Sequence, residues 1–101
     1  MSAYILVEAT LTQPKHFAAY ARAVPAVVAR YGGTYLVLGG DQESLEGDWG
    51  EQRIVIHHWP SMAAARAFWF SEEYAALKPL RAGTGSFRVT LVEGIEQETL
   101  E

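Results

Sequence analysis

The sequence contains no cysteine, which excludes disulfide bonds, thiolate metal ligands and a cysteine nucleophile. It also lacks any run of about 18 apolar residues, so we expect no membrane-spanning helix and no membrane partner. The first ten residues, MSAYILVEAT, have no basic segment before an apolar one, so we expect no signal peptide. These absences favour a cytoplasmic protein.

Basic residues are also scarce. Eight lysines and arginines stand against twelve aspartates and glutamates, which gives a net charge of -4, and the basic residues are scattered along the chain. Binding to phosphate backbones requires clustered positive charge, so we expect no nucleic-acid partner. A length of 101 residues, half of them apolar, predicts one domain with a single hydrophobic core.

The three histidines do not form a metal-binding motif. His57 and His58 are adjacent in a predicted strand, where consecutive side chains point to opposite faces, and His16 lies far away in sequence. No HxH or HExxH spacing is present. The sequence therefore predicts no metal site, and nothing in it calls for a cofactor.

Two β-rich runs form the centre of the predicted fold. Residues 34–38 (TYLVL) and 53–59 (RIVIHHW) are β-branched and aromatic, with glycine pairs around the first run and Pro60 after the second. For the segment between them we interpret residues 42–46 as a continuation of the first strand and residues 47–50 (GDWG) as the turn. The alternative is a mobile loop.

The rest of the chain supplies two further strands and the helices. Residues 3–11 are the predicted first strand of the chain and residues 86–93 the predicted last strand. A helix begins near Pro14 and ends at Gly32, and two shorter helices begin at Ser61 and Ser71. The order β-α-β-β-α-β, with a split second helix, is that of the ferredoxin-like α+β fold. We expect a four-stranded antiparallel sheet with the first and third strands central, one domain over residues 1–94, and an acidic tail over residues 95–101.

The strands are apolar on both faces, which has a consequence for assembly. The helices cover one face of such a sheet, and an apolar patch on the other would exceed what soluble monomers expose. We therefore expect a homodimer that pairs through the open face, as in a dimeric α/β barrel, with Leu45, Trp49, Ile54 and Ile56 in the interface. The alternative is a mildly apolar face that is simply solvated.

Four stretches together resemble a known family: the opening AYILVEATLTQPKHFAAYARAVPAVVARYGGTYLVLGG, the segment LEGDW, the strand of residues 53–59 followed by Pro60-Ser61, and FWFSEEYAALKPLR. The chain is similar in them to the domain of unknown function 1330 family, within the dimeric α/β-barrel superfamily. The resemblance implies ferredoxin-like protomers that pair through their sheets. The family has no settled activity, and its superfamily includes cofactor-free monooxygenases, muconolactone isomerases and haem-handling enzymes, so the fold does not specify the function.

A few side chains are candidates for chemistry. His58, on the expected dimer face, and Arg53 are the candidate catalytic residues, because imidazole exchanges protons near neutral pH and a guanidinium binds anions. The alternatives to a catalytic role are that His58 is a structural histidine and that Arg53 forms an ion pair with a carboxylate. Aromatic residues between helices and sheet would line a ligand pocket or simply fill the core. The predicted ligand-binding set is Tyr20, Arg53, His58, Trp69 and Tyr74.

Three functional hypotheses remain open from the sequence. The favoured one is a small homodimer that binds a hydrophobic or anionic small molecule. The second is a cofactor-independent monooxygenase or isomerase that acts on an aromatic or enolic substrate. The third is a structural or interaction module without chemistry of its own.

Overall fold

A computed structural model describes residues 1–95, so most of the predicted acidic tail lies outside the described residues. The predicted α+β order is confirmed. The elements are β1 (Ala3–Leu11), α1 (Pro14–Arg30), β2 (Thr34–Leu38), β3 (Arg53–Trp59), α2 (Met62–Trp69), α3 (Glu72–Leu77), the 3-10 helix η1 (Lys78–Arg81) and β4 (Gly85–Glu93).

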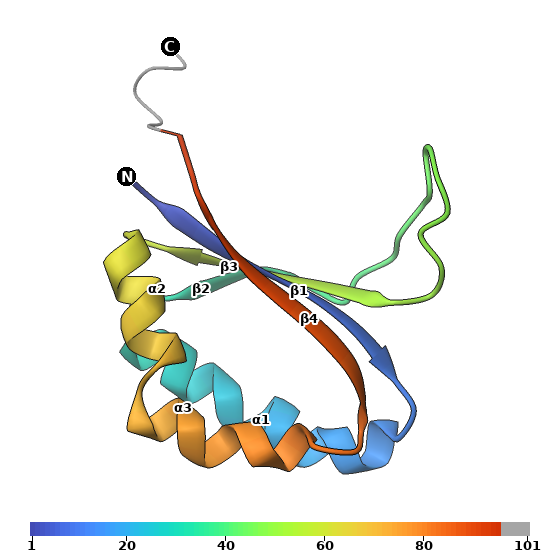
Figure 1. The fold of residues 1–101 in the computed structure, drawn as a ribbon, viewed down its shortest axis with the longest axis horizontal. Helices are drawn as coiled ribbons and strands as arrows, with labels where there is room; N and C mark the ends of the chain where they lie inside the picture. The colour runs from blue at the N-terminus through green and yellow to red at the C-terminus, as the bar shows by residue number, and fades with distance from the viewer. Residues whose placement is uncertain (96–101) are drawn as a thin grey trace.

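The four strands form one antiparallel sheet in the order β2-β3-β1-β4, with β1 and β3 central as predicted. All the helices lie against one face of this sheet, and no helix lies against the other face in the described part of the chain (Figure 1). The sheet therefore has a helix-covered face and an open face. Alternation along β3 places Arg53, Val55, His57 and Trp59 on the covered face.

Serine hydroxyls begin the two short helices, as predicted. Ser61 Oγ accepts a hydrogen bond from the backbone N–H of Ala64 at 3.0 Å, and Ser71 Oγ accepts one from that of Tyr74 at 3.0 Å. Each bond satisfies one of the N–H groups left free at a helix start. After α3, Pro79 lies in the 3-10 helix η1, which ends the α-helix and carries the chain to Arg81.

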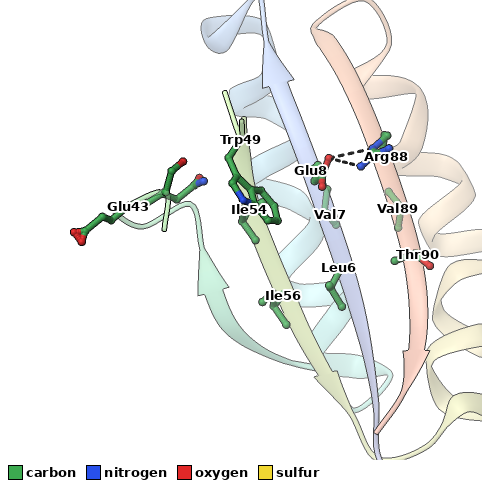
Figure 2. Close-up of a pocket in the computed structure, with 12 residues that line it drawn as sticks. Leu6, Val7, Glu8, Glu43, Trp49, Ile54, Ile56, Arg88, Val89 and Thr90 are labelled. Atoms are coloured by element: carbon green, nitrogen blue, oxygen red, sulfur yellow. Dashed lines mark hydrogen bonds and ion pairs between the residues drawn. The ribbon is translucent and has the colours of Figure 1, made fainter. Parts of the chain in front are cut away.

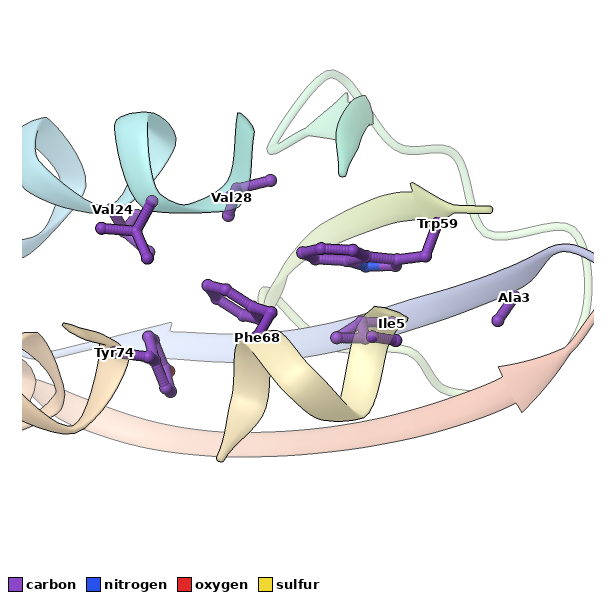
Figure 3. Packing of buried hydrophobic residues seen from close by; sticks show 9 residues of the cluster. Ala3, Ile5, Val24, Val28, Trp59, Phe68 and Tyr74 are labelled. Atoms are coloured by element: carbon purple, nitrogen blue, oxygen red, sulfur yellow. The ribbon is translucent and has the colours of Figure 1, made fainter. Parts of the chain in front are cut away.

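The core lies between the covered face and the helices (Figure 3). Trp59 and Phe68 are almost completely buried and stack with their ring centroids 4.9 Å apart. Val28 of α1 completes the centre of this cluster. This aromatic packing holds α1 and α2 over β3.

The connection between β2 and β3 differs from the prediction. Residues 39–52 contain no strand, and this loop extends away from the sheet (Figure 1). Gly39, Gly47 and Gly50 have φ values of 66°, 84° and 68°, which break the extended conformation at three points. The predicted strand over residues 42–46 is therefore wrong, and the alternative interpretation, a loop, is correct.

Candidate functional site

A cavity of about 180 Å³ lies between the covered face of the sheet and the helices. All four strands contribute to its floor, while α1, α2, α3 and η1 contribute the side chains above it. We call it the helix–sheet cavity. The lining side chains used below are Val7, Ala9, Tyr20, Tyr35, Arg53, Val55, His57, Trp69, Tyr74, Arg81, Phe87 and Val89.

Strand register arranges the floor in rows. His57, Val55 and Arg53 of β3 pair with Ile5, Val7 and Ala9 of β1, respectively. On its other side β1 pairs with β4, so that Leu91, Val89 and Phe87 complete the same three rows. The row Arg53, Ala9, Phe87 therefore lies at one end of the cavity floor, and the row His57, Ile5, Leu91 at the other.

Two arginines lie at the Ala9 end. The Arg81 guanidinium lies 4.5 Å from the centroid of the Phe87 ring and 5.8 Å from that of Tyr20, and its buried Nε has no hydrogen-bond partner among residues 1–95. Arg53 is exposed and packs its guanidinium against Gly39, where an added Cβ would come within 2.5 Å of Nη2. In the described part of the chain neither arginine forms an ion pair, and no carboxylate lines the cavity.

Tyrosine hydroxyls add hydrogen-bonding groups. The hydroxyls of Tyr20 and Tyr74 are 2.8 Å apart and share a hydrogen bond. Burial, reinforced by Tyr74, raises the pKa of Tyr20, and burial raises the pKa of Tyr35 to about 12. Both phenols stay protonated at neutral pH and can donate a hydrogen bond to an anion.

His57 is the buried polar residue of the floor, with 6% of its surface exposed. Its ring lies edge-on to Tyr35 at 4.7 Å, and Nδ1 has no partner within residues 1–95. Burial lowers the pKa of His57 to about 4, so the imidazole is neutral at physiological pH. The histidine predicted from the sequence was His58. The available signal for His57 was strand alternation, which places it on the same face of β3 as Arg53.

The structure brings together only part of the predicted ligand-binding set. Tyr20, Arg53, Trp69 and Tyr74 all line the helix–sheet cavity. His58 points to the open face, where its ring meets that of Tyr4 edge-on at 5.4 Å. His58 and Arg53 therefore do not face one common site within a protomer.

The open face carries a shallow groove beneath the loop of residues 39–52 (Figure 2). Trp49 from the loop lies beside Ile54 of β3, and the Glu8–Arg88 ion pair at 2.8 Å borders the groove. Ile54, Ile56 and Trp49, all expected in a dimer interface, line this groove. Leu45 is 90% exposed and does not line it.

The described residues contain neither a cluster of metal ligands nor a membrane-spanning helix. Within residues 1–95 no three histidine, cysteine, aspartate or glutamate side chains are placed to hold a metal ion. None of the helices described is long and apolar enough to cross a membrane.

Solved structures share this fold at low sequence identity. A protein of unknown function from Rhodopseudomonas palustris superposes with a TM-score of 0.76 at 20% identity, over 94% of this chain and 83% of the other. A dimeric ferredoxin-like protein of unknown function from Jannaschia sp. CCS1 gives 0.69 at 9% identity, over 93% and 100% of the two chains. SnoaB, a cofactor-independent oxygenase from Streptomyces nogalater, gives 0.70 at 14% identity, over 95% of each chain.

At these identities the structural similarities establish the fold alone. No protein with a curated description matches the chain. A family model does match, and it spans residues 2–95, which is nearly the whole domain seen in the structure. The chain belongs to the family named domain of unknown function 1330 (DUF1330).

Proposed function

We propose that this protein binds a small aromatic anion in the helix–sheet cavity. The observation that carries the proposal is the pair of buried, unpartnered atoms in the cavity lining, Nε of Arg81 and Nδ1 of His57, together with a second arginine, the exposed Arg53, that has no carboxylate partner within residues 1–95. Native proteins rarely leave buried polar atoms unpaired, because each costs roughly 1–3 kcal/mol. A bound anion would supply the missing acceptor for Arg81.

The size and character of the cavity limit the ligand. A cavity of about 150 Å³ accommodates one benzene ring, so the helix–sheet cavity, at about 180 Å³, has room for one ring with small substituents. Tyr20, Trp69, Tyr74 and Phe87 provide flat apolar surfaces for that ring. A single-ring aromatic carboxylate or phenolate fits these requirements.

Calorimetric titration with benzoate tests the proposal. We expect the variant Arg81→Leu to bind benzoate at least tenfold more weakly than the wild type, because a charged hydrogen bond contributes about 1.5–3 kcal/mol. Arg66→Leu is the matched control, since Arg66 is exposed on α2 and does not line the cavity. Wild-type protein that binds neither benzoate nor phenolates, or an equal loss in both variants, would refute the proposal.

A cofactor-independent oxygenase is the second candidate function. It is supported by the structural similarity to SnoaB, which is an enzyme of that kind, together with the cationic, hydrogen-bonding lining of the cavity. Without a cofactor, the substrate itself must supply all four electrons that reduce dioxygen. Arg81 and the protonated Tyr20 would stabilise the phenolate or enolate that reacts, and so lower the pKa of the substrate hydroxyl.

Labelled dioxygen distinguishes this function from simple binding. With 1,4-dihydroxybenzene as substrate, a monooxygenase would place one ¹⁸O atom in a hydroxyquinone product and release the other as water. We expect the labelled product to form faster with wild-type protein than with Arg81→Leu. Formation at the uncatalysed rate with both proteins leaves binding alone as the function.

We also propose that the protein is a homodimer that pairs through its open face. The support is the exposed apolar surface there, including Val37, Trp49 and Val92, and the similarity to ferredoxin-like proteins described as dimeric. An apolar face of this kind is stabilised when a second copy removes it from water. Leu45 and Trp49, in the extended loop, are then positioned to contact the partner.

A further inference from the structure

We infer that the helix–sheet cavity binds its ligand in one orientation, with the anionic group at the Arg53 and Arg81 end and a hydroxyl group at the His57 end. The ligand class is a single aromatic ring that carries a carboxylate and, on the opposite side of the ring, a hydroxyl. This inference rests on the proposed binding of an aromatic anion and adds the identity and direction of its two polar groups.

The positive charge is confined to one end of the cavity. The backbones of Arg53 and Phe87 lie on either side of Ala9 in one row of the floor, about 10 Å apart across two strand spacings. The Arg81 guanidinium lies over Phe87 on the β4 side of Ala9, and the Arg53 guanidinium lies against Gly39 on the β2 side. A carboxylate placed above Ala9 lies between them.

The opposite end of the cavity is neutral. His57 lies four residues from Arg53 on the same face of β3, which is about 13 Å along the strand. The side chains in ring contact with it, those of Tyr35, Trp59 and Phe68, are uncharged aromatics. A second anionic group would be desolvated there without a partner, whereas a hydroxyl can hydrogen-bond to the neutral imidazole.

The middle of the floor is apolar. Val55, Val7 and Val89 form one row across the three strands, between the arginine row and the His57 row. An aromatic ring over this row has its two ends directed to chemically different groups. The geometry therefore selects a ligand whose polar substituents lie on opposite sides of the ring.

A comparison of ligands tests the orientation. We expect wild-type protein to bind 4-hydroxybenzoate roughly three- to tenfold more tightly than benzoate, the gain of one neutral hydrogen bond. His57→Phe should remove this ratio while benzoate affinity stays within about twofold of the wild-type value. His58→Phe, the neighbouring residue on the open face, should leave the ratio unchanged.

A ligand-side control needs no variant. In 2-hydroxybenzoate the hydroxyl lies beside the carboxylate at the arginine end, so it should bind no more tightly than benzoate. This comparison keeps the inference testable if His57→Phe fails to fold. An equal gain in affinity over benzoate for 2-hydroxybenzoate and 4-hydroxybenzoate would overturn the inference. It would also be overturned if Tyr20→Phe, and not His57→Phe, removed the gain in affinity for 4-hydroxybenzoate.

The outcomes separate the two proposals. If the wild type binds none of these ligands, the proposed function fails and the orientation fails with it. If benzoate binds with dependence on Arg81 but 4-hydroxybenzoate binds no better, only the orientation fails. We expect benzoate affinity to depend on Arg81, and the ratio of 4-hydroxybenzoate affinity to benzoate affinity to depend on His57.

Discussion

His57 and His58 show how much a single position in a strand decides. The two residues are adjacent and chemically identical, yet His57 is buried in the helix–sheet cavity and His58 lies against Tyr4 on the open face. The buried imidazole has an unpartnered Nδ1 and a lowered pKa, both because the surrounding aromatic side chains exclude water. A comparison of variants at His57 and His58 therefore distinguishes effects of the covered face from effects of the open face.

His57 predicts a pH dependence of stability. Its pKa is about 4 in the folded state and about 6.5 in the unfolded state, so the unfolded state binds more protons between these values. The contribution of neutral His57 to stability is complete above pH 6.5 and is lost as the pH falls towards 4. The free energy of unfolding should fall by ~2–3 kcal/mol from this residue between pH 7.5 and 4.5.

Urea denaturation of two variants at both pH values measures that contribution. His57→Phe should reduce the pH-dependent loss by about this amount, whereas His58→Phe should retain the wild-type loss. The comparison with His58→Phe removes the contributions that the two variants share. An unchanged pH dependence in His57→Phe would contradict the assigned cause.

At Gly33 the core leaves no room for a larger side chain. A Cβ there would lie 2.7 Å from Cη2 of Trp59 and 2.8 Å from Cγ1 of Val28, and both of these residues are buried. We expect Gly33→Ala to lower the free energy of unfolding by ~1–3 kcal/mol, since the rigid indole cannot move away. Gly40→Ala is the control, because an added Cβ at Gly40 meets no atom within 4 Å. Equal denaturation midpoints for the two variants would show that the core relaxes.

At the scale of elements, Ser71 joins α2 to α3. Its Oγ accepts a hydrogen bond from the N–H of Tyr74 at 3.0 Å and donates one to the carbonyl oxygen of Phe68 at 2.7 Å. α3 has only six residues and is too short to be stable by itself, so this junction holds Tyr74 in the cavity wall.

Ser71→Ala should therefore lower the free energy of unfolding by ~1–2 kcal/mol and also weaken ligand binding in the helix–sheet cavity. Thermal denaturation and benzoate titration measure the two effects. Ser44→Ala is the matched control, because Ser44 lies in the exposed loop between β2 and β3. A loss of stability with unchanged affinity would mean that Tyr74 keeps its position without this hydrogen bond.

At the scale of the whole molecule, a substitution on the open face tests the proposed homodimer. We expect Ile56→Glu to convert the dimer to a monomer of 11.2 kDa in sedimentation at micromolar concentration, because a buried carboxylate without a partner is costly. Ala29→Glu is the control, since Ala29 is exposed on α1, away from the sheet. Trp49→Ala should raise the dissociation constant without abolishing the dimer. A wild-type protein that sediments as a monomer would refute the proposed assembly.

The sequence by itself determined the secondary structure and its order. β-branched runs, helical stripes, capping serines and Pro60 are local signals, and β1, β2 and β3 have the predicted bounds. The exception was residues 42–46, predicted as a continuation of the first strand ahead of the turn at residues 47–50; Gly39, Gly47 and Gly50 have positive φ, and the segment lies in a loop directed away from the sheet (Figure 1). Periodicity in sequence does not specify whether a segment finds a pairing partner.

Four residues of the set predicted from the sequence line the helix–sheet cavity, but tertiary structure decided which face of the sheet carries the site. Alternation showed that His57 and His58 point opposite ways, but only the packing of α1, α2 and α3 determined which of the two faces is covered. Arg81 reaches the cavity because the 3-10 helix after α3 carries it over Phe87, a contact between distant parts of the chain. Burial and missing hydrogen-bond partners depend on all surrounding elements at once, and no local pattern in the sequence encodes them.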